Sequence, residues 1–324
     1  MSLPTNTYTN YDAKGNREDL EDVIYDISPT DTPFLSNAGR VKAKGVFHEW
    51  QIDALDSAGS NKQLEGDDAT GNTLAATTRY GNYCQIARKV VVVSGTQEAI
   101  DKAGRDSEMK YQIAKAGKAL KRDMEYALTQ NQAIENGSEA TARALGSVES
   151  WLFSAAGNVT DGTGGTTPAY SSGALAGPTD ASASYLLTFT EARLKTAIQQ
   201  CWTDGGDPKV VMVGPYNKTV ASGFGGIATL YKDVPGKKQA TVIGAADVYV
   251  SDFGEHMIVP NRFSRDRTAL ILDFDYWKVA TLRPIQQIAL SKTGDNEKRE
   301  MLVEFTLVAA NPNASAKVAD LKTS

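Results

Sequence analysis

The segment PTDTPFLSNAGRVKAKGVFHEWQ, residues 29–51, decides how the chain is organised because it separates a short helical pattern from the first extended pattern. Pro29 stops the preceding helix, since proline disfavours helical geometry in the residue before it, and PTDTP then predicts a turn with an extended exit. Phe34 and Leu35 are apolar, which is unusual for a linker. We therefore expect these two side chains to anchor the segment on the body of the protein.

The residues before this segment predict an arm. Residues 1–16 are polar and rich in Asn, Thr and Tyr, so they have little to bury and are expected to be extended until a partner surface orders them. Residues 17–27, REDLEDVIYDI, place apolar side chains at helical spacing with acidic side chains near the positive helix start. This pattern predicts a short amphipathic helix.

The residues after this segment predict a long excursion. Residues 47–55 and 80–93 show partial alternation of apolar and polar side chains, which predicts two strands. Residues 56–79 between them contain several glycines and few large apolar groups. The pair therefore predicts a two-stranded hairpin with an irregular tip, which would be only marginally stable alone in water.

The strongest local pattern runs from Ser107 to Glu135, where apolar side chains fall on one face and alanines add helix propensity. It predicts one long helix, which at about 1.5 Å per residue would span roughly 44 Å. Asn136-Gly137 predicts the stop of this helix, because glycine tolerates left-handed backbone geometry.

The second half of the chain predicts a compact α/β part and a set of strands. Residues 155–184 are rich in Gly, Ala, Ser and Thr and predict a long surface excursion. A helix at 189–201, a buried strand at 209–214 and a helix beginning at Pro215 follow. Further strands are expected at 247–253, 255–260, 268–274, 276–282, 286–291 and 301–310, with a charged hairpin turn at 292–300.

Composition is that of an ordinary globular protein. The chain has 324 residues, 41% hydrophobic and 23% charged, with a net charge of −5, which argues against a nucleic-acid-wrapping or membrane-surface protein. The N-terminus lacks the pattern of a secretory signal, and no apolar run approaches membrane-spanning length. Cys84 and Cys201 lie far apart without a CxxC spacing, so we expect reduced thiols.

Residues that could carry chemistry are few. His48 and His256 are the two histidines of the sequence, and each lies in a predicted strand, so we expect structural roles and no metal site. The glycine-rich stretches 161–165 and 223–226 lack the spacing and lysine of a phosphate-binding loop and are expected to be flexible loops. EGDD, residues 65–68, lacks the ligand pattern of a calcium loop. We predict no catalytic, cofactor-binding or metal-binding residues and no cofactor.

Charge patterning instead suggests contacts between copies of the chain. Basic residues cluster from Lys102 to Arg122, and the acidic segment 17–27 could pair with them on a neighbouring subunit. A solvated helix face is the alternative interpretation. The residues we expect at such contacts are Glu18, Asp19, Glu21, Asp22, Arg79, Arg88, Lys110, Lys118 and Arg122.

The order of these predicted elements resembles the Hong Kong 97-type capsid fold of tailed phages. The opening stretch also resembles a subfamily of phage major capsid proteins in which DLEDVIYDISPTDTPFLS precedes HEWQ, as residues 19–36 and 48–51 do here. The resemblance implies an α+β fold whose parts are an N-arm at 1–41, an E-loop hairpin at 42–98, a long spine helix at 99–136, an α/β axial domain with a Gly/Ser/Thr-rich excursion at 137–274, and peripheral-domain strands at 275–324. His48, Glu49 and Trp50 would then begin the excursion toward a neighbour.

The resemblance implies a structural role without catalytic residues. Identical chains would form pentamers and hexamers that close an icosahedral or prolate head around packaged double-stranded DNA, contacted without sequence specificity. Portal, scaffold and decoration proteins would be further partners, no membrane would be involved, and assembly would take place in the host cytoplasm before the chain resides in the virion.

Two alternatives stay open from the sequence. An encapsulin-like nanocompartment protein would share the fold, and an enzyme could bind a small ligand near KVVMVGPYNK, residues 209–218. The founding member of the fold carries a lysine–asparagine cross-link between subunits, but no such pair can be assigned here and we predict none. Multiples of 34.7 kDa that survive boiling and reductant in denaturing electrophoresis would contradict this expectation.

Overall fold

The computed structural model describes residues 31–323, except 56–57, 67, 69–70, 72–75, 103, 154–158, 166–168 and 225–247. The first half of the chain contains the elements α1 (Pro33–Asn37), β1 (Gly39–Lys42), β2 (Phe47–Ile52), β3 (Thr78–Tyr83), β4 (Gln85–Ser94), α2 (Gly95–Ala99), α3 (Glu108–Thr129), α4 (Val148–Trp151) and β5 (Val159–Thr160). The second half contains η2 (Ala183–Tyr185), α5 (Glu191–Thr203), β6 (Val210–Val213), α6 (Pro215–Ala221), β7 (Val248–Ser251), β8 (Gly254–Pro260), β9 (Ala269–Leu272), β10 (Trp277–Leu290), β11 (Asn296–Ala309), η3 (Pro312–Ala314) and β12 (Ala316–Val318). The predicted helix at 17–27 lies outside the described residues.

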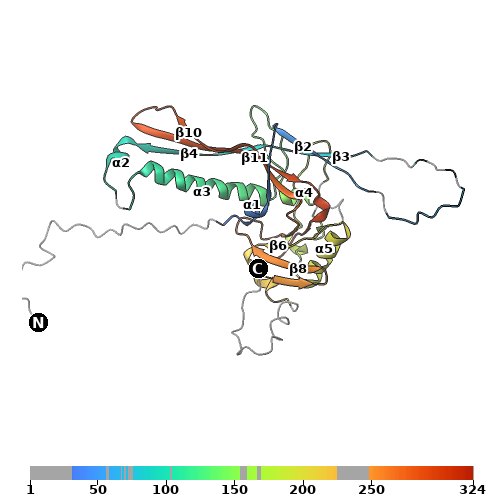
Figure 1. Ribbon diagram of the computed structural model, residues 1–324. Helices are drawn as coiled ribbons and strands as arrows, with labels where there is room; N and C mark the ends of the chain where they lie inside the picture. The colour runs from blue at the N-terminus through green and yellow to red at the C-terminus, as the bar shows by residue number, and fades with distance from the viewer. Residues whose placement is uncertain are drawn as a thin grey trace, which may run out of the picture.

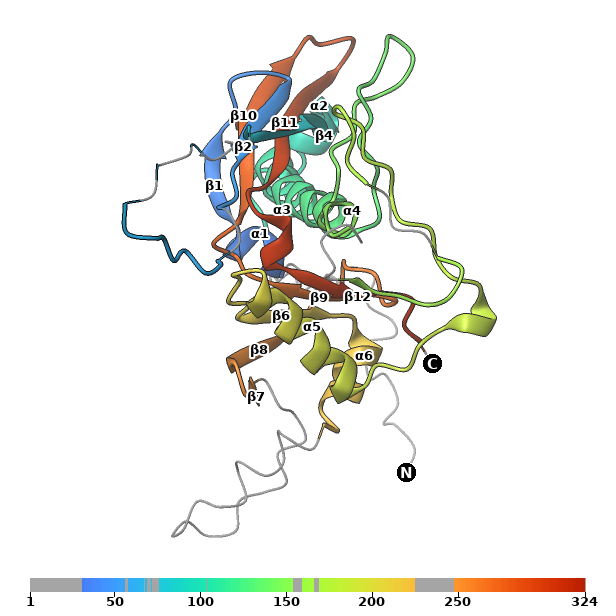
Figure 2. The ribbon, with the colours of Figure 1, turned by 90° about the vertical axis from the view of Figure 1, so that its right-hand side faces the viewer.

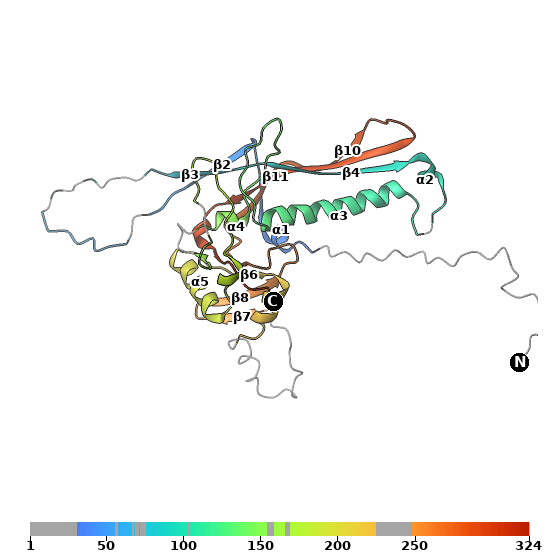
Figure 3. The same cartoon turned by 180° about the vertical axis from the view of Figure 1, so that it is seen from behind.

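Three sheets organise these elements. A four-stranded sheet has the order β1-β10-β11-β4, a six-stranded sheet the order β5-β12-β9-β6-β8-β7, and β2 and β3 form a separate pair. Helix α3 runs along β4 and β11, whereas α5 and α6 lie beside the six-stranded sheet (Figures 1 and 2). The β2–β3 pair leads into a long loop that reaches away from both sheets (Figure 3).

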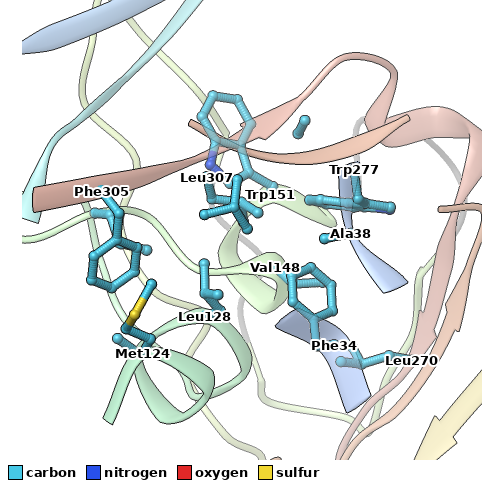
Figure 4. Close-up of a cluster of buried hydrophobic side chains, with 14 of the residues drawn as sticks. Phe34, Ala38, Met124, Leu128, Val148, Trp151, Leu270, Trp277, Phe305 and Leu307 are labelled. Atoms are coloured by element: carbon cyan, nitrogen blue, oxygen red, sulfur yellow. The ribbon is translucent and has the colours of Figure 1, made fainter. Parts of the chain in front are cut away.

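One hydrophobic core joins the long helix to both larger sheets. Buried side chains from α1, α3, α4, β10 and β11 meet Met212 and Leu270 of the six-stranded sheet (Figure 4). The opposite face of the six-stranded sheet, including Val211 and Ile271, packs with α5 in a second cluster. Strands β6 and β9 are therefore apolar on both faces, which explains why they appear in the sequence as short continuous apolar runs.

Helix α3 confirms the predicted long helix but is shorter than expected. Ser107 caps its start, its side chain accepting a hydrogen bond from the Lys110 backbone N–H. The helix ends at Thr129, and its 22 residues span about 33 Å. Asn136-Gly137 does not stop it: Gly137 has φ +75° in a turn whose flanks, Glu135 and Ala144, pair as a bridge. The chain leaves the helix at Gln130, whose backbone is extended, and the Ile134 N–H then bonds the Leu175 carbonyl oxygen at 2.8 Å.

The strand predicted at 80–93 is two strands. The ladder breaks at Cys84, whose N–H bonds the Val46 carbonyl oxygen at 2.8 Å. Before the break β3 pairs with β2, and after it β4 pairs with β11. The predicted hairpin is therefore confirmed only for its outer part, while β4 belongs to the four-stranded sheet.

The C-terminal strands are longer than predicted. The strands predicted at 276–282 and 286–291 are one strand, β10 (Trp277–Leu290), which keeps pairing with β11 through register shifts around Pro284. Irregularities of this kind accommodate a proline, which has no N–H for the ladder. The predicted turn at 292–300 is mostly strand, because β11 already begins at Asn296.

Candidate functional site

The two histidines hold no reactive arrangement. His256 is buried, with Nδ1 at 2.5 Å from the Pro208 carbonyl oxygen and Nε2 at 2.7 Å from Ser251 Oγ. The Ser251 hydroxyl also accepts a bond from the Phe253 N–H, so it completes the β7–β8 turn. Burial lowers the pKa of both His48 and His256, which favours neutral imidazoles. These contacts fit the structural role predicted for His256.

Within the described part of the chain, the cysteine and acidic residues form no reactive or metal-binding group either. Cys84 and Cys201 are buried and free, and burial raises the pKa of their thiols to about 11 and about 12. No group of three or more His, Cys, Asp or Glu residues that could hold a metal ion occurs among the described residues. No described helix is long and apolar enough to cross a membrane.

The glycine-rich stretch 161–165, predicted to be a flexible loop, is held by Asp320 at Gly162. Asp320 Oδ2 accepts a hydrogen bond from the Gly162 N–H at 2.9 Å, and Asp320 Oδ1 accepts one from the Ala181 N–H at 2.8 Å. A Cβ at residue 162 would lie 2.6 Å from the Tyr185 carbonyl oxygen, so this close approach requires glycine. Part of the second stretch, 223–226, and of EGDD, 65–68, lies outside the described residues.

A buried ionic cluster that the sequence did not indicate ties this region to the core. Glu149 Oε1 accepts bonds from Arg265 Nη1 at 2.7 Å and Thr268 Oγ1 at 2.9 Å. The Lys317 side chain is fully buried, and its Nζ donates to the Glu149 carbonyl oxygen at 2.9 Å. Burial raises the pKa of Glu149 and lowers that of Lys317 to about 8. Glu149 and Lys317 are enclosed in the protein, so the cluster is part of the interior and does not form a surface site.

Helix α1, which we call the arm root because it follows the predicted arm, is held by one carboxylate. Phe34 is fully buried, and its backbone N–H donates to Glu125 Oε1 at 2.8 Å, while the Leu35 N–H donates to Glu125 Oε2 at 2.8 Å. Asn261 Nδ2 donates to Glu125 Oε1 at 2.7 Å. Burial raises the pKa of Glu125, and the three hydrogen bonds oppose that shift. The expected anchoring by Phe34 is confirmed, and Leu35 packs partly buried against the same core.

The extended loop leaves the body only after Trp50. The indole of Trp50 donates to the Ala309 carbonyl oxygen at 2.9 Å, and its ring centroid lies 5.3 Å from that of Trp151. The Trp50 side chain therefore packs on the body of its own chain. This corrects the expectation that Trp50 begins the excursion toward a neighbour. Beyond β2, Leu55 is 98% exposed and Leu64 is 80% exposed.

The four-stranded sheet presents an open face on the side away from α3. Register places Val90, Glu300 and Ile288 in one row across β4, β11 and β10, and paired residues share a face of the sheet. The opposite face meets α3, since Lys89 and Asp123 form an ion pair there at 2.5 Å. The exposed apolar side chains of the open face are Ile86, Val90, Val92 and Ile288.

The predicted contact residues occupy different places. Arg79 pairs with Glu49 at 3.2 Å within the β2–β3 pair, and Arg88 lies 3.7 Å from Glu300 on the open sheet face. The Arg122 guanidinium covers the Phe263 ring of the same chain, 5.4 Å from its centroid. The acidic residues Glu18, Asp19, Glu21 and Asp22 lie outside the described residues.

Lysines line one flank of α3. Lys110, Lys118 and Lys121 are exposed. Together with Ala114 they follow one another at intervals of three or four residues, so they lie along one side of the helix. Continuing the same spacing along the helix leads to Glu125, which holds the arm root. The structure thus brings Lys110 and Lys118 into one row that ends at the arm root, which the sequence pattern alone did not place.

Comparisons with known proteins point in one direction. The sequence model of the SU10 major capsid protein family matches residues 4–322. A major capsid protein of Escherichia phage Phieco32 is 27% identical over 347 residues, covering 97% of each chain. Among solved structures, a chain of the Cyanophage A-1(L) capsid asymmetric unit has a TM-score of 0.64 at 14% identity, covering 97% of this chain and 99% of that one. A chain from Microbacterium phage Oxtober96 has a TM-score of 0.61 at 14% identity, covering 97% and 98%.

Proposed function

Because this chain belongs to the SU10 major capsid protein family, we propose that its arm, its extended loop and the lysine-bearing flank of α3 are the surfaces through which identical subunits join in a closed head. The chain has the Hong Kong 97-type fold and is a structural shell protein of tailed phages, not an enzyme. A phage shell therefore replaces both the nanocompartment and the enzyme hypotheses.

The proposal extends to the parts of the subunit. Residues 1–41 would be the N-arm, 42–98 the E-loop, 99–136 the spine helix, 137–274 the axial domain and 275–324 the peripheral strands, and residues 19–36 with 48–51 would mark a subfamily. The observation that supports this division best is the extended loop, because Leu55 and Leu64 are almost fully exposed on a segment that leaves both sheets. Apolar side chains on such a segment gain stability when a second copy of the chain covers them.

Charge supports a role for the arm. Glu18, Asp19, Glu21 and Asp22 would face the row formed by Lys110, Lys118 and Lys121 on a neighbouring subunit. An exposed ion pair contributes about 0.2–1 kcal/mol, so such pairs would specify register more than strength. Arg79, Arg88 and Arg122 have contacts within their own chain and would take part only through their remaining exposed atoms.

Pentamers and hexamers of this chain would enclose double-stranded DNA in an icosahedral or prolate head assembled in the host cytoplasm. The net charge of −5 supports enclosure without tight, sequence-specific contacts, because phosphate binding requires many basic side chains. A closed shell also needs an entry for DNA and a means of setting its size, which would be supplied by portal, scaffold and decoration proteins.

Expression of the chain alone, followed by negative-stain microscopy and light scattering, tests this proposal. The full chain should give capsomers, shells or tubes, and a variant lacking residues 1–27 should stay folded but form no closed shells. A full-length control with amides in place of Glu18, Asp19, Glu21 and Asp22 separates the charge of the arm from its length. Intact shells from the truncated chain would refute the role of the arm, and a persistent monomer from the full chain would refute self-assembly.

A further inference from the structure

Glu125 occupies the point where three separate parts of the chain meet. It lies in α3, its carboxylate accepts bonds from the backbone of α1, and it accepts a third from Asn261, which directly follows β8 of the six-stranded sheet. The residue is fully buried. Burying a carboxylate is costly, so its retention here requires that each oxygen be well bonded.

Two of the three hydrogen bonds of this carboxylate lie at the arm root. Helix α1 has no side-chain cap of its own at Thr32, so Glu125 supplies the acceptors for the N–H groups of Phe34 and Leu35. Asn261 is held in turn, because its Oδ1 accepts a bond from the Phe263 N–H at 2.8 Å. A shift of the six-stranded sheet relative to α3 would therefore move Asn261, the third hydrogen-bond partner of the carboxylate that holds the arm root.

We propose that Glu125 is a positioning residue that fixes the arm root on the subunit, and that it couples the position of the arm root to the placement of the six-stranded sheet. The three hydrogen bonds form a clamp, which we define as Phe34, Leu35, Glu125 and Asn261. The clamp is a property of the single subunit, whereas its consequence for shell closure rests on the function proposed for the arm.

Two substitutions probe the clamp from opposite sides. In Glu125→Gln, an amide oxygen at the Oε1 position can still accept from Phe34 and Asn261, while the amide nitrogen faces the Leu35 N–H and loses that bond. Asn261→Asp keeps the acceptor for Phe263 but places an oxygen against Glu125 in place of a donor. Glu108→Gln is the matched control: Glu108 is also a buried glutamate of α3, bonded to Arg105 and Gln112 at the far end of the helix.

Hydrogen–deuterium exchange of the unassembled subunit, followed by mass spectrometry, measures the clamp directly. Amide exchange in residues 33–38 should become about tenfold faster in Glu125→Gln, as expected for one lost bond to a charged group, with residues 305–309 as an unchanged internal reference. Asn261→Asp should also speed exchange in 33–38, although it lies in another part of the chain, and Glu108→Gln should not.

Unchanged exchange in 33–38 in either clamp variant would overturn the proposal, as would equal acceleration of all core peptides in both. Asn261→Asp decides the question if Glu125→Gln does not fold. Microscopy of the same variants separates the two hypotheses: faster exchange together with normal shells would support the clamp and show that shell closure does not depend on it, whereas the truncation of residues 1–27 tests the arm itself.

Discussion

Phe34 offers the most direct test of how the arm root contributes to stability. Its ring is fully buried, with centroids 5.4 Å from Phe274 and 6.4 Å from Trp277. Burying a phenylalanine removes roughly 150–250 Å² from water, and at about 25 cal/mol per Å² this corresponds to about 4–6 kcal/mol as an upper bound. Since alanine retains part of this area and a cavity remains, we expect Phe34→Ala to lower the free energy of unfolding by about 4 kcal/mol.

Urea denaturation of the unassembled subunit, followed by tryptophan fluorescence, measures this loss. The dependence of the unfolding free energy on urea concentration should be the same in the variant and the wild type. Phe34→Leu is the control, because it keeps most of the volume and should cost about 1 kcal/mol. A loss below about 1 kcal/mol for Phe34→Ala would refute the reasoning. It would mean that the arm root folds onto the core without contributing to its stability.

Two predictions concern the buried ionic cluster. Arg265→Met should lower the free energy of unfolding by about 3 kcal/mol, because it removes the cation that hydrogen-bonds the buried Glu149 carboxylate. Arg265→Met/Glu149→Gln should recover most of that loss in thermal denaturation, and equal losses in the single and double variants would contradict this. Burial lowers the pKa of Lys317 from 10.5 to about 8. Between these two pH values the folded state therefore binds fewer protons than the unfolded state, so the free energy of unfolding rises with pH. Lys317→Met should lack this rise, of order 1 kcal/mol per pH unit, and parallel pH profiles of the wild type and Lys317→Met between pH 8 and 10 would argue against it.

The sequence predicts elements well wherever local periodicity and packing agree. Helix α3 follows from its apolar face, and α5 and α6 begin at Glu191 and Pro215 close to the expected positions. The strands β6 and β9 are apolar because both larger clusters cover them. Here one local pattern suffices, because the same residues that set the period also make the core contacts.

The wrong predictions share one cause: the residues that decide the pairing lie far away in the sequence. Nothing between Tyr80 and Val93 indicates that the first part joins β2 and the second β11, since both parts have strand character. Likewise Pro284 predicts a break, but the ladder to β11 continues on either side of it. Glu125 carries no local sign of its role, because its partners are 90 or more residues away.

The paired strands β10 and β11 also have a mechanical consequence. Each has 14 residues, so the ribbon is roughly 46 Å long. Its inner end is fixed in the core, where Trp277 is fully buried and its Nε1 donates to Ser315 Oγ at 2.9 Å. A lever arm of this length converts a tilt of about 5° at its base into a displacement of roughly 4 Å at its tip. In a shell built from such subunits, small angular changes at the base of this ribbon would therefore become shifts of several ångströms where its tip meets a neighbour.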